Sequence, residues 1–201
     1  MKFLVFLFFS NILFSQNFIE NSTVKMKILK KELVRFDEPN YFKKDQLVSI
    51  ILPEYLTYET EQNEIEVAYV KMLFEIGNEN FKKISIGPFQ MQLKFIFENI
   101  MKCNDSLLDC DLFQDCKRNG IVSLVKNINY YSTLQYQWKI LKLFESNLIK
   151  KGKKSIDDMR LYYNSGSLIK NKITFSKLED RNMSYSEWCS YLYNIYAKIK
   201  V

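Results

Sequence analysis

The sequence predicts one mainly α-helical domain with a small β or turn excursion near its middle. Its 201 residues suit a single domain with an ordinary hydrophobic core. The composition, 47% hydrophobic and 15% aromatic against 26% charged, is typical of a folded globular protein. Only five glycines and three prolines interrupt the chain, so turns are sparse and helices should dominate.

The first two helices are expected between residues 46 and 77. Asp45 can cap a helix over residues 46–52, which is apolar nearly all round and therefore buried, and Pro53 then kinks or stops it. A second helix should run from about Glu61 to Ile76, with Gly77 in the C-terminal cap position. Helical spacing predicts its buried face from Ile65, Ala68, Met72 and Ile76.

The middle of the chain alternates between turn signals and one more helix. Residues 81–91 are rich in Ile, Phe and Ser and contain Gly87-Pro88, which indicates a turn or a small β excursion. Leu93 to Met101 again has a helical pattern, and Cys103 to Gly120 is interpreted as a polar, Asp-rich connection.

The second half shows the clearest helix signals. Ser132 to Lys151 is the best-defined amphipathic helix, and Gly152 closes it. Ser155 should cap a further helix that leads to Tyr163. The last helix opens with a capping box over residues 184–187, Ser-Tyr-Ser-Glu.

Residues 1–16 have the pattern of a secretory signal peptide. Lys2 provides a basic start, and the following apolar run ends in small polar residues. This run is shorter than the roughly 20 residues that cross a bilayer, so we expect cleavage near Ser15 or Gln16 and no stable membrane span. Residues 17–201 would then be one exported domain, periplasmic or extracellular.

The chain contains four cysteines, Cys103, Cys110, Cys116 and Cys189, and no histidine. An exported protein meets an oxidising compartment, so one or two disulfides are expected, with the connectivity open. A zinc site is disfavoured because there is neither a C-x-x-C pair nor a histidine, and no metal or other cofactor is expected.

The absence of histidine also restricts the chemistry. Neither a Ser-His-Asp nor a Cys-His centre can be assembled, so any hydrolytic reaction must use carboxylates, Tyr, Lys or unassisted Ser and Thr. The formal charge of +6 favours an anionic polymer as partner, although solvated lysines at helix ends explain the excess equally well. No nucleic-acid motif is present.

Two short stretches stand out because glycine is scarce. The first is Ser85-Ile86-Gly87-Pro88-Phe89-Gln90-Met91, and the second is Tyr162-Tyr163-Asn164-Ser165-Gly166. Over roughly residues 46 to 170, this order resembles the lysozyme-like fold of soluble lytic transglycosylases and goose-type lysozymes. In that family a helix ends in a catalytic Glu, and a Ser and Gly-x-x-Gln, a long helix and a Tyr-Asn-x-Gly follow.

The resemblance leaves the catalytic glutamate open between Glu54 and Glu75, with Glu66 a more distant third. Spacing in the resembled enzymes favours Glu75, which ends a hydrophobic helix. Burial favours Glu54, since the apolar helix before it would desolvate the carboxyl and raise its pKa, as a general acid requires. Leu52-Pro53-Glu54-Tyr55 also looks like the start of the signature in a group of exported lysozyme-like bacterial proteins.

By resemblance, the chain would cleave the glycan strands of peptidoglycan with one glutamate that acts first as acid and then as base. Gln90 and Ser85 would hydrogen-bond the sugar or the acid, Gly87 would let the backbone approach the glycan, and Tyr163 with Asn164 would line the cleft. The alternatives are a catalytically inactive module of the same fold that binds glycan or protein in the cell envelope, and an unrelated exported helical interaction protein.

Overall fold

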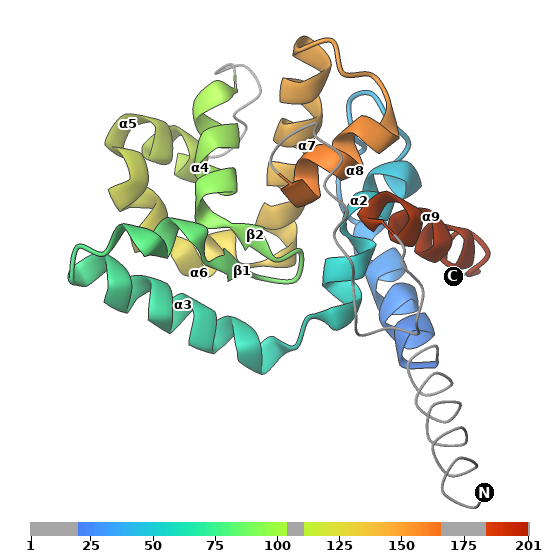
Figure 1. The fold of residues 1–201 in the computed structure, drawn as a ribbon, viewed down its shortest axis with the longest axis horizontal. Helices are drawn as coiled ribbons and strands as arrows, with labels where there is room; N and C mark the ends of the chain where they lie inside the picture. The colour runs from blue at the N-terminus through green and yellow to red at the C-terminus, as the bar shows by residue number, and fades with distance from the viewer. Residues whose placement is uncertain (1–19, 104–110, 166–183, 201) are drawn as a thin grey trace, which may run out of the picture.

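Helices make up most of the part of the chain that the computed structural model describes, residues 20–103, 111–165 and 184–200 (Figure 1). The predicted signal peptide, residues 1–16, lies outside these residues. Residues 20–33 are helical, and the other elements follow. They are α2 (Lys44–Thr57), α3 (Thr60–Glu75), the 3₁₀ helix η1 (Glu79–Lys83), β1 (Ser85–Ile86), β2 (Met91–Gln92), α4 (Leu93–Lys102), α5 (Asp111–Lys126), α6 (Ile128–Tyr131), α7 (Leu134–Lys150), α8 (Ile156–Ser165) and α9 (Tyr185–Tyr196).

One group of helices packs around α2. Helices α8 and α9 contact α2 and each other, and the helix over residues 20–33 lies beside them (Figure 1). The ammonium group of Lys25 donates to the carbonyl of Leu56, and that of Lys44 donates to the carbonyl of Leu33. These contacts fix the helix over residues 20–33, which the sequence analysis did not identify, against both ends of α2.

A second group contains α3, the two short strands, α4 and α5 (Figure 1). Strands β1 and β2 pair antiparallel, with Ser85 opposite Gln92 and Ile86 opposite Met91. The sequence therefore predicted the β excursion and the helix after it correctly. Strand β2 leads directly into α4, so the turn between the strands is held at the N-terminal end of that helix.

Helix α7 connects the two groups through buried polar side chains. Glu145 is fully buried, and its carboxylate accepts hydrogen bonds from the backbone N–H groups of residues 40–42 at 2.8–3.1 Å. Gln137, also fully buried and two turns earlier in the helix, holds the turn between the strands. One helix thus fixes both the loop that precedes α2 and the hairpin.

The predicted boundaries of α2 were wrong. The helix begins at Lys44 and continues through Pro53 to Thr57, so Glu54 lies within it. Pro53 removes its own N–H from the helical ladder, which leaves the Ser49 carbonyl without its usual donor, and the proline ring crowds that carbonyl. The adjacent carbonyl of Ile50 is satisfied by α9, where Tyr185 Oη donates at 2.9 Å and Cys189 Sγ at 3.7 Å. Helix α9 therefore stabilises α2 in the turn that precedes its proline.

The predicted buried face of α3 was also wrong. Val67, Val70 and Leu73 are buried, whereas Ile65, Met72 and Ile76 are 71%, 48% and 67% exposed. The helix carries two apolar stripes, and periodicity detects both without showing which one meets the core. Helix α3 packs against η1, where Phe74 meets Phe81 edge to face at 5.3 Å between ring centroids. This packing buries the stripe that contains Val67, Val70 and Leu73.

The expected connection between Cys103 and Gly120 is partly helical. Helix α5 begins at Asp111 and is kinked at Gly120, whose φ of 69° is left-handed. Asp111, in its first turn, complements the positive end of the helix dipole. Residues 104–110 lie outside the described part.

No disulfide joins the described cysteines, and Cys110 is not among them. Cys116 and Cys189 are buried free thiols, and burial raises the pKa of Cys116 to about 11. Among the described cysteines, Cys189 is therefore bridged to neither Cys103 nor Cys116. No helix in the described ranges combines the length and apolar character needed to cross a membrane.

Candidate functional site

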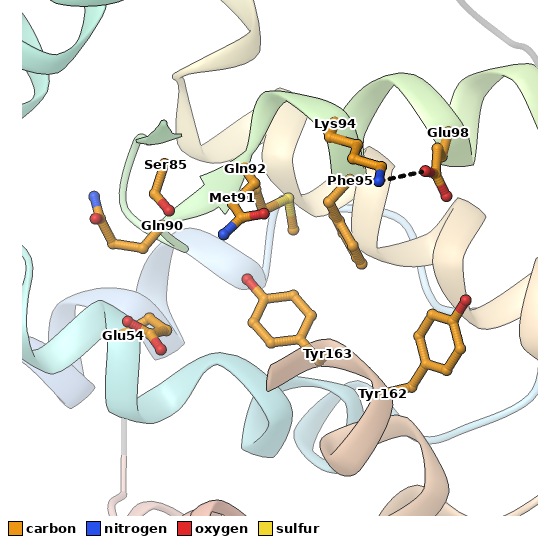
Figure 2. Close-up of a pocket in the computed structure, with 10 residues that line it drawn as sticks. All are labelled: Glu54, Ser85, Gln90, Met91, Gln92, Lys94, Phe95, Glu98, Tyr162 and Tyr163. Atoms are coloured by element: carbon orange, nitrogen blue, oxygen red, sulfur yellow. Dashed lines mark ion pairs between the residues drawn. The ribbon is translucent and has the colours of Figure 1, made fainter. Parts of the chain in front are cut away.

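A pocket of about 520 Å³ lies between the α2 and α8 group and the hairpin with α4 (Figure 2). Its volume falls in the range of pockets that bind small molecules or a few sugar rings. Residues from α2, both strands, α4 and α8 form its wall: Glu54, Ser85, Gln90, Met91, Gln92, Lys94, Phe95, Glu98, Tyr162 and Tyr163. Four residues selected from the sequence, Glu54, Ser85, Gln90 and Tyr163, thus come together in one site.

Glu54 is the acid in this pocket. Burial raises its pKa from 4.5 to about 7, so that near neutral pH a large fraction of the carboxyl is protonated. The side chain makes neither a hydrogen bond nor an ion pair with another described residue that would stabilise its charged form. The cause lies in α2, where residues 47–53 are all buried and surround the base of the side chain with apolar atoms.

Glu145 shows what a purely structural buried carboxylate looks like in this fold. It accepts three backbone hydrogen bonds and has no access to the pocket. Glu54 is half-buried, accepts none of these bonds and faces an open volume. A carboxyl with a raised pKa and free access to a pocket is the combination expected of a proton donor.

The Gly87–Gln90 turn forms one wall beside Glu54. Gln90 N–H donates to the Gly87 carbonyl at 2.9 Å, and both residues adopt left-handed backbone angles, with φ of 70° and 49°. For Gln90 such an angle is strained, because its Cβ approaches the backbone. Surrounding contacts must hold this turn, and strain of this kind is common at ligand-binding sites.

Gly87 serves internal packing rather than approach to a ligand. A Cβ atom at this position would lie 2.4 Å from Gln137 Nε2 and 2.5 Å from the carbonyl oxygen of Ser132. Gly87 is buried and does not line the pocket, so the role that the sequence analysis gave it is wrong. The glycine is needed because α7 contacts the turn backbone directly.

Helix α3 supports the same turn from outside. Asn63 Oδ1 accepts from Gly87 N–H at 2.9 Å, and Glu66 Oε2 accepts from Gln90 Nε2 at 3.1 Å. A further bond from Gln90 Nε2 to the Gly87 carbonyl closes the turn. Glu66, the third candidate acid, therefore holds Gln90 in its strained conformation and does not line the pocket.

Tyr163 joins α8 to the turn across the pocket. Its hydroxyl donates to the Phe89 carbonyl at 2.5 Å, and its ring packs edge to face on Phe95. Burial, with the nearby charge of Glu54, raises the pKa of Tyr163 well above 10, so the hydroxyl keeps its proton and remains a donor. Figure 2 shows the ring between Glu54 and α4.

The end of the pocket opposite Glu54 carries opposite charges (Figure 2). Glu98 lies 3.9 Å from Lys94 Nζ and 2.6 Å from Lys102 Nζ. Sequence reasoning missed Lys94, Glu98, Gln92, Phe95 and Tyr162. Their position directly after Gln90, or beside Tyr163, and the i, i+4 spacing of Lys94 and Glu98 were the available signals.

Of the two other predicted site residues, Glu75 does not join this group, and the side chain of Asn164 is not described. Glu75 is exposed at the C-terminal end of α3 and does not line the pocket. Asn164 belongs to α8, but its side chain lies outside what the structure describes. Among the described residues, no group of three or more Cys, Asp and Glu side chains is arranged to hold a metal ion.

The arrangement supplies one carboxyl that can give and take a proton near neutral pH, a polar wall and an aromatic floor. Such a site suits acid–base chemistry on an uncharged polar substrate. Comparisons with protein-family models, curated proteins and solved structures find no match to this chain.

Proposed function

We propose that this protein is a lysozyme-like glycosidase of the lytic transglycosylase type, which cleaves the glycan strands of peptidoglycan. The observation that carries the proposal is Glu54, a carboxyl with a pKa of about 7 in a pocket walled by the Gly87–Gln90 turn and Tyr163. These are the three segments that resemble the family in sequence order.

The reaction needs one carboxyl that changes its role. Protonated Glu54 gives its proton to the glycosidic oxygen between N-acetylmuramic acid and N-acetylglucosamine, and the bond to the muramic acid carbon breaks. The substrate's own acetamide, or an oxocarbenium-like state, carries the positive charge that develops. Glu54, now ionised, takes a proton from the 6-hydroxyl of the same sugar, which closes a 1,6-anhydro ring and restores the acid.

The pocket supports a mechanism with a single carboxyl. Glu98, the other acid in its wall, lies at the opposite end and is paired with Lys94 and Lys102 (Figure 2). Retaining and inverting glycosidases instead place two carboxyls on either side of the scissile bond. Ser85 and Gln92 offer neutral hydrogen-bonding groups to the sugar, and Tyr163 holds the turn.

The remaining properties fit an exported protein that acts on the cell wall. The amino-terminal pattern over residues 1–16 favours export, and the net charge of +6 favours an anionic polymer such as peptidoglycan. The chemistry needs no cofactor.

The test is to incubate the purified protein with isolated cell-wall sacculi and to identify the soluble products by mass spectrometry. We expect 1,6-anhydro muropeptides from the wild type and none from Glu54→Gln. Glu75→Gln is the matched control and should release as much as the wild type.

Muropeptides with a reducing end would show that the protein is a hydrolytic muramidase and not a transglycosylase. A wild-type protein that sediments with sacculi but releases nothing would favour the inactive glycan-binding module. A protein that does neither would contradict the proposal.

A further inference from the structure

The outer face of α3 carries an exposed apolar stripe. Ile65, Tyr69, Met72 and Ile76 are 71%, 45%, 48% and 67% exposed. Their spacing of four, three and four residues places them in one line along about three turns of the helix. Four large apolar side chains in one line exceed the scattered exposure that a monomer's surface normally shows, and such a stripe is typical of an interface.

Unpaired negative charge follows one edge of this stripe. Glu61, Glu64 and Glu75 are exposed, and none forms an ion pair with another described residue. At about 100° per residue, all three lie on the counterclockwise side of the stripe, viewed along α3 from its N-terminus. A surface that binds here should combine an apolar centre with positive charge on one side.

The helix over residues 20–33 presents a surface of that description. Val24 and Ile28 are 56% and 50% exposed and lie one turn apart, while Met26, Leu29 and Leu33 of the same helix are buried. Lys27 and Lys31 are exposed, form no ion pair with another described residue, and follow the counterclockwise edge of Val24 and Ile28.

We propose that this protein self-associates, with the helix over residues 20–33 of one copy lying antiparallel on the α3 stripe of another. On each helix the charged residues lie on the counterclockwise side of the exposed apolar residues. When the two apolar surfaces face each other, the charged sides meet only if the helices run antiparallel. Val24 and Ile28 then pack among Ile65, Tyr69 and Met72. Lys27 and Lys31 lie beside the glutamates. The antiparallel arrangement also places the positive end of each helix dipole beside the negative end of the other, which is favourable.

The contact joins two different surfaces of the protein, and this limits the kinds of assembly that can form. Pairing in both directions closes a two-fold dimer, and pairing in one direction gives a closed ring or an open chain. Figure 1 shows α3 and the helix over residues 20–33 both in the lower part of the view.

Sedimentation velocity of the purified chain over a wide concentration range tests the proposal. We expect reversible self-association that Ile65→Asp weakens by roughly tenfold or more, because a charge replaces a buried apolar contact. Val122→Asp is the matched control, since Val122 is 57% exposed on α5 and belongs to neither surface. Circular dichroism checks that each variant keeps its helices.

Charge reversal identifies the partner surface. Lys27→Glu with Lys31→Glu, or Glu61→Lys with Glu64→Lys, should each weaken association by about threefold to tenfold, with a steeper effect at low salt. Mixing the two double variants should restore it, because each then meets an opposite charge on the other. Lys126→Glu on α5 is the charge control.

A wild-type chain that stays monomeric at every concentration overturns the proposal. So does association that survives Ile65→Asp. If Ile65→Asp dissociates the protein but both charge reversals leave association unchanged, the pairing with the helix over residues 20–33 is wrong.

Discussion

Glu54 and Glu75 occupy the last turns of two successive helices, yet their surroundings are opposite. Glu54 lies in α2 with buried residues before it and the hairpin across the pocket, and its pKa rises to about 7. Glu75 ends α3, with solvent around it and the left-handed Gly77 two residues on. The same side chain near the end of a helix becomes a desolvated carboxyl with a raised pKa, or stays exposed to solvent, according to what packs over it.

The largest expected difference between these two regions is in catalysis. Glu54→Gln removes the transferable proton and should lower the rate of anhydro-muropeptide release by about 10²- to 10⁴-fold, as for loss of a general acid. Glu75→Gln should leave the rate within about twofold, because surface substitutions remote from the site have small effects. Initial rates on sacculi measure both. Equal losses in the two variants would remove the distinction.

The second largest difference is expected between Gly87 and Gly77, in the free energy of unfolding that each loses on substitution by alanine. Gly87→Ala places a Cβ against Gln137 and the Ser132 carbonyl in addition to its left-handed strain. We expect it to lower the free energy of unfolding by about 3 kcal/mol or more. Gly77→Ala has the same left-handed backbone but no atom within 4 Å, and should cost about 1 kcal/mol. Urea denaturation of both variants checks the difference.

The raised pKa of Glu54 also makes the free energy of unfolding depend on pH. Its folded pKa of about 7 exceeds the value of 4.5 expected in the unfolded chain, so the folded state binds the proton more tightly. The contribution of this group to stability should therefore be highest below pH 4.5 and fall by about 3 kcal/mol as the pH rises through 7. Thermal or urea unfolding against pH should show this slope in the wild type and in Glu75→Gln.

Glu54→Gln is the control for that slope, since glutamine does not titrate. The variant should be more stable than the wild type at pH 8 although it is inactive. In the active protein, glycan cleavage should decline above a pH of about 7, where the acid is deprotonated. A slope that persists in Glu54→Gln would assign it to other groups.

The smallest expected effect concerns the tyrosine that joins α8 to the hairpin. Tyr163→Phe removes the donor to the Phe89 carbonyl and should lower the free energy of unfolding by about 1 kcal/mol. Tyr69→Phe on the exposed stripe of α3 is the matched control and should change it by less than about 0.5 kcal/mol. Equal effects in both variants would mean that the hydrogen bond contributes nothing.

The sequence predicted most helices because their signals are local. The capping box of α9 forms as expected, with Ser184 accepting from Glu187 N–H, and Ser155 accepts from Asp158 N–H at the start of α8. Gly152 adopts a left-handed φ of 77° after α7, as a closing glycine should. The errors occurred where distant contacts decide, as in the passage of α2 through Pro53 and the choice of buried face in α3.

The candidate site could be predicted only in part for the same reason. Two glycine-marked stretches and one apolar helix were visible along the chain, and the structure brings Glu54, Ser85, Gln90 and Tyr163 into one pocket. The support of Gln90 by Glu66 and the contact of Gly87 with Gln137 left no trace in sequence spacing.

By itself, the amino-acid sequence determined the helical class, most cap positions, the short hairpin and the exclusion of histidine chemistry. Each of these follows from residue type or from contacts within a few residues. Only the tertiary structure decided which glutamate is desolvated and which apolar stripe of α3 stays exposed. Burial depends on the elements that pack from far along the chain, and α7, α8 and α9 all follow these glutamates by dozens of residues.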